Sequence, residues 1–329
     1  MQIVSITTNL TRYGGAQKVL LDLHNGLKSK FDCKIVGFQD FDQLHPKYGI
    51  KKPEYEKLSY SSLQNKIIIV HARNVIPIIV ALNTFLFLKS KIVYVSHNVY
   101  STHKYFTFFP KTIVSISNKV TENLINYFGV KSDRINLIYN GIEDKYPLNH
   151  THIYKQDGIL KILYPARVNS VKRQLQIVNV LKDQLNDQVQ IHFAGTGDDL
   201  DELHKICSSS KNFKALGFVE NLESKLLNYD YVMLYSTQEG LPLSLLEGIM
   251  CKKPLITNNV GGNWEIGVPG FNGVGLNEDW NMLAQQVNDL LDVDENQYKL
   301  MSDRSRNLFL QKFKLEKMIE NYSDLIKSL

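Results

Sequence analysis

The chain alternates short apolar runs, rich in Val and Ile, with amphipathic stretches of helical period, and this alternation constrains its fold more than any other feature. Several runs are continuously apolar, which is typical of strands buried on both faces of a sheet. Strands are predicted at residues 2–7, 33–38, 66–70, 91–96, 112–116 and 134–138, with helices at 16–30, 77–89 and 118–128. Strand, helix and strand at this spacing predict βαβ units and a parallel sheet.

The pattern breaks once and then resumes. Residues 144–158 are polar and carry Pro and Gly, which is typical of an interdomain linker. Strands are predicted again at 160–164, 189–194, 213–216, 231–235 and 254–257, followed by an amphipathic helical tail at 295–329. A length of 329 residues suits two domains. We therefore predict an α/β protein of two doubly wound, Rossmann-like domains, 1–150 and 151–329, facing a cleft at the strand C-termini, with the C-terminal helix packing back on the N-terminal domain.

Composition excludes several classes of protein. Three scattered cysteines, Cys33, Cys207 and Cys251, form no C-x-x-C pair and support neither a disulfide framework nor a zinc site. The longest apolar stretch, 75–88, has about 14 residues where a bilayer span needs ~18–20, and we interpret it as a buried helix. The opening residues show no basic segment or cleavage site, so we expect a cytoplasmic protein.

Charge is unevenly distributed along the chain. Residues 1–155 hold 20 Lys or Arg against 10 Asp or Glu, whereas residues 156–329 hold 18 against 23. A basic half beside an acidic half indicates that the first half faces an anionic partner. Candidates are a nucleic acid, a phosphorylated ligand or the inner leaflet of a membrane, where each surface Lys or Arg contributes about 1 kcal/mol. The alternative is a solvated surface with a skewed charge count.

Several well-known motifs are missing or incomplete. The segment 193–200 starts like a dinucleotide fingerprint, but Leu200 stands where a third Gly or Ala is required. No P-loop, H-E-x-x-H or G-x-S-x-G motif occurs, which argues against NTP hydrolysis, zinc proteolysis and α/β-hydrolase chemistry. The acidic run 198–201 is typical of a helix start rather than of a metal site.

The strongest cluster of candidate site residues spans 236–247, directly after the predicted strand 231–235. Pro242 is placed to open a helix, whose first backbone N–H groups have no intrahelical acceptor and can bind an anion. Glu239 lies in the loop beside that site. Glu247 lies on the helix, and its carboxylate is suited to accept hydrogen bonds from paired sugar hydroxyls.

Basic and polar residues occupy corresponding junctions elsewhere. Arg167 and Lys172 follow the predicted strand 160–164, and a planar guanidinium with a compact ammonium suits a pyrophosphate. The glycine-containing loop 8–16 follows the first strand, where backbone amides can approach a phosphate. His97 ends the strand 91–96 and is a candidate polar contact, although a lone histidine is commonly structural.

Taken in order, these segments resemble the retaining GT-B glycosyltransferases of family 4, over nearly the whole chain. Glu239-x7-Glu247 is similar to the family's E-x7-E motif, and the segment 260–266 to the G-G-x-x-E segment that follows it. Arg167 and Lys172 resemble its R-x4-K phosphate pair. The remaining matches are 140–142, which resembles N-G-[VI], and Gly14-Gly15, which resembles the N-terminal glycine loop. Departures are Leu241-Pro242, where Phe-Gly is frequent, and Asn263-Trp264, where Ile-Pro is frequent.

The resemblance implies a metal-independent hexosyltransferase that uses a UDP- or GDP-linked sugar and needs no cofactor. The implied catalytic residues are His97, which meets the sugar, and Glu239. Arg167 and Lys172 would neutralise the diphosphate leaving group. The full set of implied donor-binding residues is Gly15, Arg167, Lys172, Leu243, Ser244 and Glu247, with the amides around Leu243 and Ser244 holding the sugar and Glu247 holding the ribose hydroxyls.

Retention of configuration is implied in the same way. No second carboxylate is evident as a nucleophile, so the two-carboxylate scheme of retaining hydrolases is not assigned. A front-face mechanism, in which the leaving phosphate helps to deprotonate the acceptor, is the implied alternative. The acceptor is expected to be a glycan or a lipid-linked glycan of surface polysaccharide or glycoconjugate synthesis.

The segment 100–111 packs aromatic residues with Lys104 and Lys111. An exposed loop of this composition suits a membrane interface, and the alternative is a core-packed segment. With the basic first half, it favours a lipid-linked acceptor and peripheral attachment to the inner face of the membrane.

Two other functions remain open: a nucleotide-sugar epimerase on the same fold, which Glu239-x7-Glu247 disfavours, and a non-catalytic protein that binds sugar nucleotides. No nucleic-acid partner is expected, because the chain lacks an RRM, KH or helix-turn-helix signature.

Overall fold

The computed structural model describes residues 2–11, 14–147 and 149–329, which divide into two compact units. The N-terminal unit comprises Met1–Glu143 together with Lys314–Leu329, and the C-terminal unit comprises Asp144–Phe313. The chain therefore leaves the first unit before residue 150 and returns to it at Lys314.

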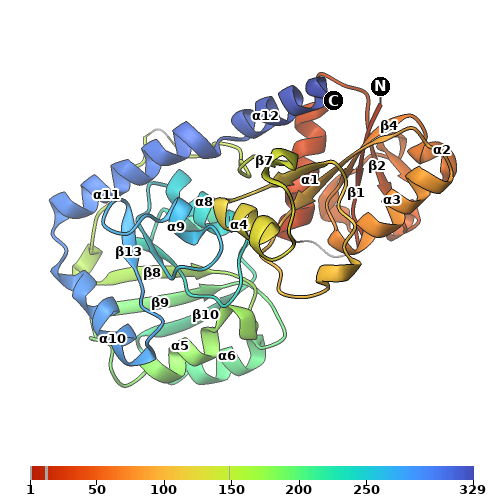
Figure 1. Cartoon of the computed structure of the whole chain (residues 1–329). Coiled ribbons are helices and arrows are strands. Elements are labelled where there is room, and N and C mark those ends of the chain that lie inside the picture. Colours follow the sequence, from red (N-terminus) through yellow and green to blue (C-terminus); the bar gives the residue numbers. More distant parts are fainter. Residues whose placement is uncertain (1, 12–13, 148) are drawn as a thin grey trace. The chain divides into compact units, whose positions relative to one another are not determined.

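The described part of the N-terminal unit is built on a seven-stranded parallel sheet of order β3-β2-β1-β4-β5-β6-β7 (Figure 1). Its strands are β1 (Gln2–Ile6), β2 (Cys33–Gly37), β3 (Tyr55–Lys57), β4 (Lys66–Val70), β5 (Lys91–Ser96), β6 (Thr112–Ser115) and β7 (Ile135–Leu137). Its helices include α1 (Gly15–Leu27), α2 (Tyr60–Leu63), α3 (Ile76–Phe85), α4 (Asn118–Asn126) and α12 (Leu315–Ser328).

The described part of the C-terminal unit has a six-stranded parallel sheet of order β10-β9-β8-β11-β12-β13. Figure 1 shows α5, α6 and α10 on one side of this sheet and α8 on the other. The strands are β8 (Leu160–Pro165), β9 (Val189–Ala194), β10 (Phe213–Gly217), β11 (Tyr231–Leu234), β12 (Leu255–Thr257) and β13 (Gly273–Gly275). The helices include α5 (Gln174–Leu181), α6 (Leu200–Cys207), α7 (Leu222–Leu226), α8 (Leu243–Met250), α9 (Asn263–Ile266), α10 (Trp280–Asn288) and α11 (Glu295–Leu308).

The predicted architecture of two parallel-sheet α/β domains is confirmed, and the predicted strands lie within two residues of the observed ones. The central strands are buried, as their continuous apolar runs require: Ile68, Ile69 and Val70 of β4 have no exposed surface. β3 and β13 were missing from the prediction, because neither is an apolar run, whereas β7 and β12, which are equally short, contain Ile and Leu. The predicted tail helix is interrupted at the π-helical turn Phe309–Phe313, after which α12 begins.

The prediction that residues 75–88 form a buried helix is wrong for much of the segment. α3 buries Ile76 and Ile79, but Phe85 and Phe87 at its end are each 78% exposed. A helix that packs on one face of a sheet buries only the side that contacts the sheet. The outer side stays exposed unless another element covers it, even when its residues are apolar. No helix among residues 2–11, 14–147 and 149–329 has the length and apolar character of a bilayer span.

The predicted linker is anchored to the C-terminal unit. Arg306 donates hydrogen bonds of 2.8 and 2.7 Å to the two carboxylate oxygens of Asp144. Asp230 lies just before β11 and accepts hydrogen bonds from the ring of His152 at 3.0 Å and from the backbone N–H groups of Lys155 and Lys161 at 3.2 and 2.7 Å. One buried carboxylate therefore joins the linker to the first residues of two central strands.

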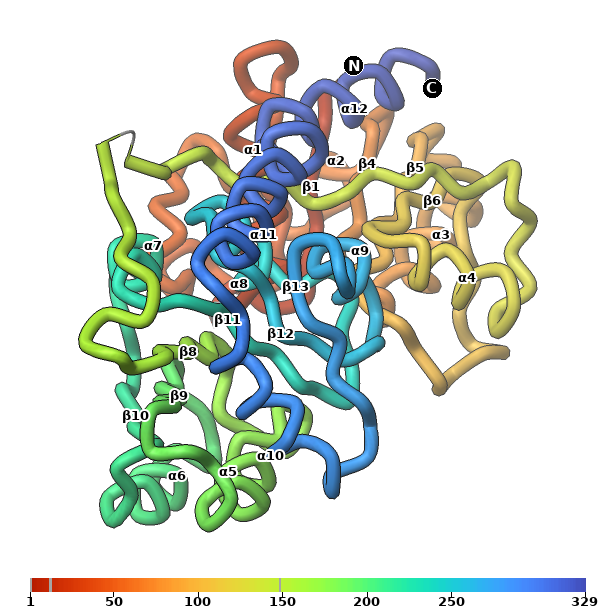
Figure 2. Tube along the Cα trace, turned by 90° about the vertical axis from the view of Figure 1, so that its left-hand side faces the viewer, coloured from red at the N-terminus to blue at the C-terminus, as the bar shows by residue number. Residues whose placement is uncertain are grey.

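The C-terminal helix α12 contacts α1 within the N-terminal unit, as the trace in Figure 2 also shows. The chain enters α12 beside Gly141: Ile142 forms a parallel bridge with Lys314, and the N–H of Leu315 donates to the carbonyl of Ile142 at 2.9 Å. A Cβ on Gly141 would overlap the backbone of Lys314. The glycine between Asn140 and Ile142 is thus required for this close approach.

Replacing Gly141 by Ala is expected to destabilise the protein by about 2 kcal/mol, since backbone atoms must move to admit the methyl group. Thermal unfolding measures the loss, and trypsin cleavage at Lys314 should become faster because α12 detaches. Gly129→Ala is the control, because Gly129 has φ +74° and open space around it. This change should lower stability by only about 1 kcal/mol, since alanine disfavours the left-handed conformation. Cleavage at Lys314 should be unchanged. Equal cleavage of both variants would contradict the packing role of Gly141.

Candidate functional site

Loops from separate strands meet at the C-terminal edge of the second sheet. The hydroxyl of the buried Tyr164, in β8, donates to the carbonyl of Lys172 at 2.6 Å and accepts from the N–H of Tyr235 at 2.9 Å. The N–H of Thr237 donates to the carbonyl of Val171 at 2.9 Å. These bonds hold the loop after β8 against the loop after β11.

The two loops are joined by an ion pair between the half-buried Lys172 and the buried Glu239. Glu239 is only 7% exposed, and its Oε1 also accepts a hydrogen bond of 2.6 Å from the hydroxyl of Ser236. Lys172 ends the short 3-10 turn Ser170–Lys172, which Asn169 caps by accepting from the N–H of Lys172 at 3.2 Å. The structure therefore brings together two of the predicted site residues that lie 67 positions apart.

The helix α8 begins just beyond this pair. Pro242 is its N-cap, so Leu243 and Ser244 are its first residues and their N–H groups have no acceptor within the helix. Glu247 lies one turn further along α8, on the side of Leu243 and Ser244, and is half-buried. Four of the predicted site residues thus lie on one loop and the helix that follows it.

A glycine pair brings a third loop against Glu239. Gly261, after β12, has φ +55°, and a Cβ on it would overlap the carbonyl and Cβ of Glu239. The N–H of Gly262 donates to the carbonyl of Gly240 at 2.7 Å. The G-G pair seen in the sequence therefore has a steric role, because it allows this loop to contact the backbone that carries Glu239.

Arg167 is exposed on the loop after β8, and its guanidinium has no hydrogen bond or ion pair within the described ranges. The loop is placed by glycines after β9: a Cβ on Gly195 would overlap Ala166, and a Cβ on Gly197 would overlap Val168. The glycines of the segment 193–200, which starts like a dinucleotide fingerprint, thus allow close packing against the loop that carries Arg167.

Three further residues of this region escaped the sequence analysis. The amide of the fully buried Asn258 is hydrogen-bonded to the backbone of Ser236, at 3.2 and 2.8 Å, and donates to Glu278 at 2.6 Å. Arg173 donates to Glu278 at 3.0 Å and lies over the rings of Tyr235 and Trp280. Asn258 follows a predicted strand, so its position was a usable signal, whereas the pairing of Arg173 with Glu278 depends on the fold.

In the N-terminal unit, His97 at the end of β5 is paired with a second histidine. Nε2 of His97 and Nδ1 of His71, which follows β4, are 2.9 Å apart, and the two rings are nearly parallel. One nitrogen donates and the other accepts. His71 is 5% exposed, and its Nε2 has no partner among the described residues.

Gly15 is the exposed first residue of α1, in the connection that follows β1. β1, β4 and β5 are neighbours in the sheet, so Gly15 and the two histidines follow adjacent strands. Arg12 and Tyr13 of the predicted glycine loop lie outside the described residues.

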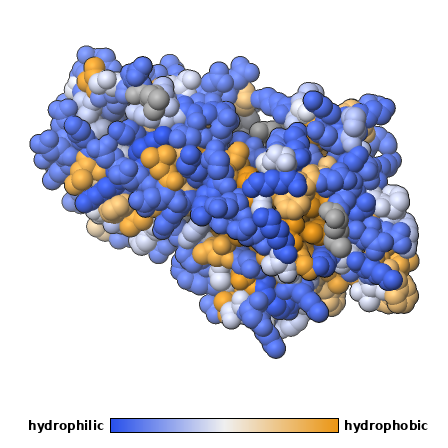
Figure 3. Space-filling model, turned by 90° about the horizontal axis from the view of Figure 1, so that it is seen from above, coloured by the Kyte–Doolittle hydropathy of each residue, from blue (hydrophilic) through white to orange (hydrophobic). Residues whose placement is uncertain are grey.

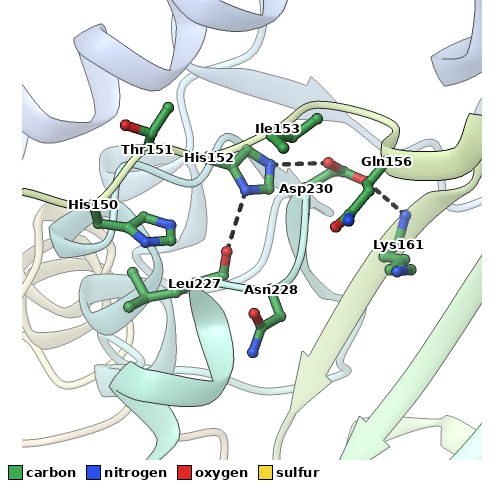
Figure 4. Close-up of a pocket in the computed structure, with 9 residues that line it drawn as sticks. All are labelled: His150, Thr151, His152, Ile153, Gln156, Lys161, Leu227, Asn228 and Asp230. Carbon is green, nitrogen blue, oxygen red and sulfur yellow. Dashed lines mark hydrogen bonds and ion pairs between the residues drawn. The ribbon is translucent and has the colours of Figure 1, made fainter.

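A cavity of about 90 Å³ lies at the opposite edge of the C-terminal sheet (Figure 4). In Figure 4 the ring of His152 points to Asp230 and to the carbonyl of Leu227, the bonds that anchor the linker. This cavity contains none of the predicted site residues. Within the part of the chain that the structure describes, no three His, Cys, Asp or Glu side chains are grouped so as to hold a metal ion.

Two family models match the chain. Glycosyl transferases group 1 matches residues 150–308, and Glycosyltransferase Family 4 matches residues 13–146. The O-antigen biosynthesis glycosyltransferase WbnH of Escherichia coli is 25% identical over 355 aligned positions, which cover 100% of this chain and 99% of that protein.

Solved structures with the same fold are known. Alr3699/HepE of Anabaena, in complex with UDP, has a TM-score of 0.84 at 19% identity and full coverage of both chains. The pneumococcal O-GlcNAc transferase GtfA, in complex with UDP and GlcNAc, has a TM-score of 0.79 at 11% identity, covering 100% of this chain and 99% of that one. Both likenesses support the GT-B fold.

The histidine pair, in which His71 is buried and His97 half-buried, predicts how stability depends on pH. Burial lowers the pKa of His97 to about 4 and also lowers the pKa of His71, whereas an unfolded histidine has a pKa near 6.5. Between these values the unfolded chain binds more protons, so the free energy of unfolding should fall as the pH drops from about 6.5 to about 4. His97 contributes up to about 3 kcal/mol. Urea unfolding across this range should show a shallower pH dependence for His97→Gln, and an unchanged slope would contradict the buried neutral state.

Proposed function

Because this chain is a GT-B glycosyltransferase of group 1 with a Glycosyltransferase Family 4 domain, we propose that it transfers a hexose from a UDP-linked sugar, with retention of configuration and without a metal ion. The observation that carries the proposal is the Lys172–Glu239 ion pair beside the N-terminus of α8. The UDP found with HepE and GtfA favours UDP over GDP as the donor nucleotide.

Lys172 and Arg167 bind the donor diphosphate in this proposal. An ammonium has three donors, so Lys172 can keep its bond to Glu239 and still donate to a phosphate oxygen. The exposed guanidinium of Arg167 adds a planar pair of donors. Together they stabilise the charge that develops on the leaving diphosphate, the work for which other enzymes use a metal.

The transferred sugar lies against Glu239 and the first N–H groups of α8, at Leu243 and Ser244. Its hydroxyl groups donate to Glu239, whose carboxylate is held in place by Lys172 and Ser236. Glu247 accepts hydrogen bonds from the ribose hydroxyls. Gly15 is assigned to the diphosphate and His97 to the sugar in this proposal.

The reaction is a front-face substitution in this proposal. The bond between the anomeric carbon and the phosphate oxygen breaks, and the acceptor oxygen bonds to the same face of that carbon. The acceptor proton moves to the leaving diphosphate, so no protein carboxylate forms a covalent intermediate. The neutral His97 supports this by hydrogen bonding to the sugar without adding positive charge.

The acceptor is a glycan or lipid-linked glycan of surface polysaccharide synthesis. The support is the likeness to WbnH, an O-antigen biosynthesis glycosyltransferase that matches this chain from end to end.

The donor site is tested by thermal shift with UDP, GDP, ADP and their sugar conjugates, without added metal. UDP or a UDP-sugar at a hundred times its Kd is expected to stabilise the protein by ~2.7 kcal/mol. Arg167→Ala should lose this shift, because it removes a diphosphate contact. Lys182→Ala is the matched control, since Lys182 is exposed on the other end of α5. No shift with any nucleotide would refute a donor site, and a shift that survives in Arg167→Ala would refute the assignment of Arg167.

The sugar contact is tested by Glu239→Gln, which keeps the shape but removes the charge. We expect turnover of the UDP-sugar to fall about 10²-fold, the effect of losing one preorganised electrostatic contact. Glu202→Gln, an exposed change on α6, should keep full activity. Full turnover by Glu239→Gln would show that the sugar binds elsewhere.

A further inference from the structure

We propose that the N-terminal unit docks on an anionic lipid bilayer through a surface made by the end of α3 and the loop 100–111, here called the aromatic face. It shares no residue with the donor site proposed above. Its test therefore stands or falls independently of the proposed reaction.

The end of α3 presents phenylalanine rings to solvent on a rigid turn. Phe85 and Phe87 are each 78% exposed, although Leu88 between Phe87 and Lys89 is completely buried. Phe87 and Lys89 have φ values of +50° and +55°, a left-handed conformation that costs a residue with a Cβ about 1–2 kcal/mol. The backbone is thus strained at both neighbours of Leu88. The side chains of Phe87 and Lys89 are exposed, while that of Leu88 is buried.

Hydrogen bonds hold this turn in place. The side chain of Asn83 accepts from the N–H of Ser90 at 3.0 Å and donates to its carbonyl at 3.1 Å. The carbonyl of Leu88 accepts from the N–H of Asn65 at 2.8 Å. The exposed rings are therefore fixed before any partner binds, which lowers the entropic cost of docking.

The loop 100–111 supplies the second part of the aromatic face. Tyr105 is 84% and Phe106 74% exposed, and Phe108 is exposed as well. The core-packed alternative applies to Phe109, which packs on Tyr94 and Phe128, and to the buried Pro110. Most of the face drawn in Figure 3 is hydrophilic. A group of exposed aromatic rings is typical of an interaction site.

Both parts belong to the same side of the N-terminal sheet. β4, β5, β6 and β7 are consecutive neighbours, and right-handed crossovers put all their connections on one face. α3 joins β4 to β5, and the loop 100–111 lies in the connection from β5 to β6. Arg73, which precedes the start of α3, donates to the carbonyl of Thr102 at 2.6 Å and lies over the ring of Tyr100, so the start of the α3 connection contacts the start of the loop.

The charge of this region is of one sign. No Asp or Glu occurs between Glu56 and Glu122, a stretch that contains the whole aromatic face. Lys89 and Lys111 are exposed and have no ion-pair partner in the described part of the chain. Lys104 lies over the ring of Tyr127.

A lipid surface fits this combination better than a second copy of the chain. An isologous dimer would bring the same patch of each copy together, and Lys89, Lys104 and Lys111 would then face their own copies across an apolar contact. A bilayer instead offers acyl chains for the phenylalanines, a headgroup layer for Tyr105 and anionic phosphates for the lysines.

The experiment is co-sedimentation of the full chain with phosphatidylcholine vesicles, with and without phosphatidylglycerol. We expect binding to the anionic vesicles that weakens as salt is added. The double variant Phe85→Ser with Phe87→Ser should bind at least about tenfold more weakly, because it removes two apolar side chains from the bilayer. Lys89→Glu with Lys111→Glu should lose at least about fivefold for each lysine removed.

The matched control is Phe218→Ser with Leu300→Ser, which removes two exposed apolar side chains from the C-terminal unit. It should sediment like the unchanged chain, and the thermal unfolding of all variants should be similar because the altered side chains are exposed. No binding of the unchanged chain to anionic vesicles overturns the proposal, as does equal binding by the Phe85/Phe87 variant. A dimer that this variant dissociates in analytical ultracentrifugation, with no vesicle binding, would assign the aromatic face to a second copy instead.

Discussion

A parallel sheet forces all its strands to end at one edge, and the strand order then decides which loops meet there. In the C-terminal sheet β8 and β11 are neighbours although two strands lie between them in the sequence. Because β8 and β11 are neighbours, the loops that follow them, which carry Lys172 and Glu239, lie side by side. In the N-terminal sheet the pairing of β4 with β5 places His71 against His97 in the same way. The polar chemistry of both units is thus a consequence of which strands are neighbours.

The edge of the second sheet is organised mainly by backbone contacts. Tyr164 and Asn258 bond to main-chain groups of the surrounding loops, and Gly261 lets one loop touch another. Burying an ion pair costs desolvation energy that only good geometry repays, and these contacts supply the geometry for Lys172 and Glu239. A carboxylate in this setting has few alternative positions, which suits the proposed role of Glu239 in orienting a sugar.

Much of this molecule could be predicted from its sequence, because buried parallel strands are continuous apolar runs and their ends carry the polar residues. The same rule that singled out His97 would have found His71, which follows the predicted strand 66–70. The pairing of Lys172 with Glu239 could not be predicted from the sequence, because it depends on the order of the strands in the sheet rather than on a local sequence pattern. The prediction that the helix at 75–88 is buried was wrong, because composition shows how apolar a helix is but not whether another element covers its outer side. β3 and β13 lack the apolar residues that revealed the equally short β7 and β12.

The return of the chain to the N-terminal unit at Lys314 makes the C-terminal unit an insertion within the other's sequence. On the ribosome, the inserted unit is complete in sequence as soon as Phe313 has emerged. The unit that begins first must wait for α12, which is synthesised after the whole inserted unit, before its own α1 is covered. Order of synthesis and order of completion are therefore reversed, and the earlier unit passes through translation with an uncovered apolar helix face that is open to chaperones.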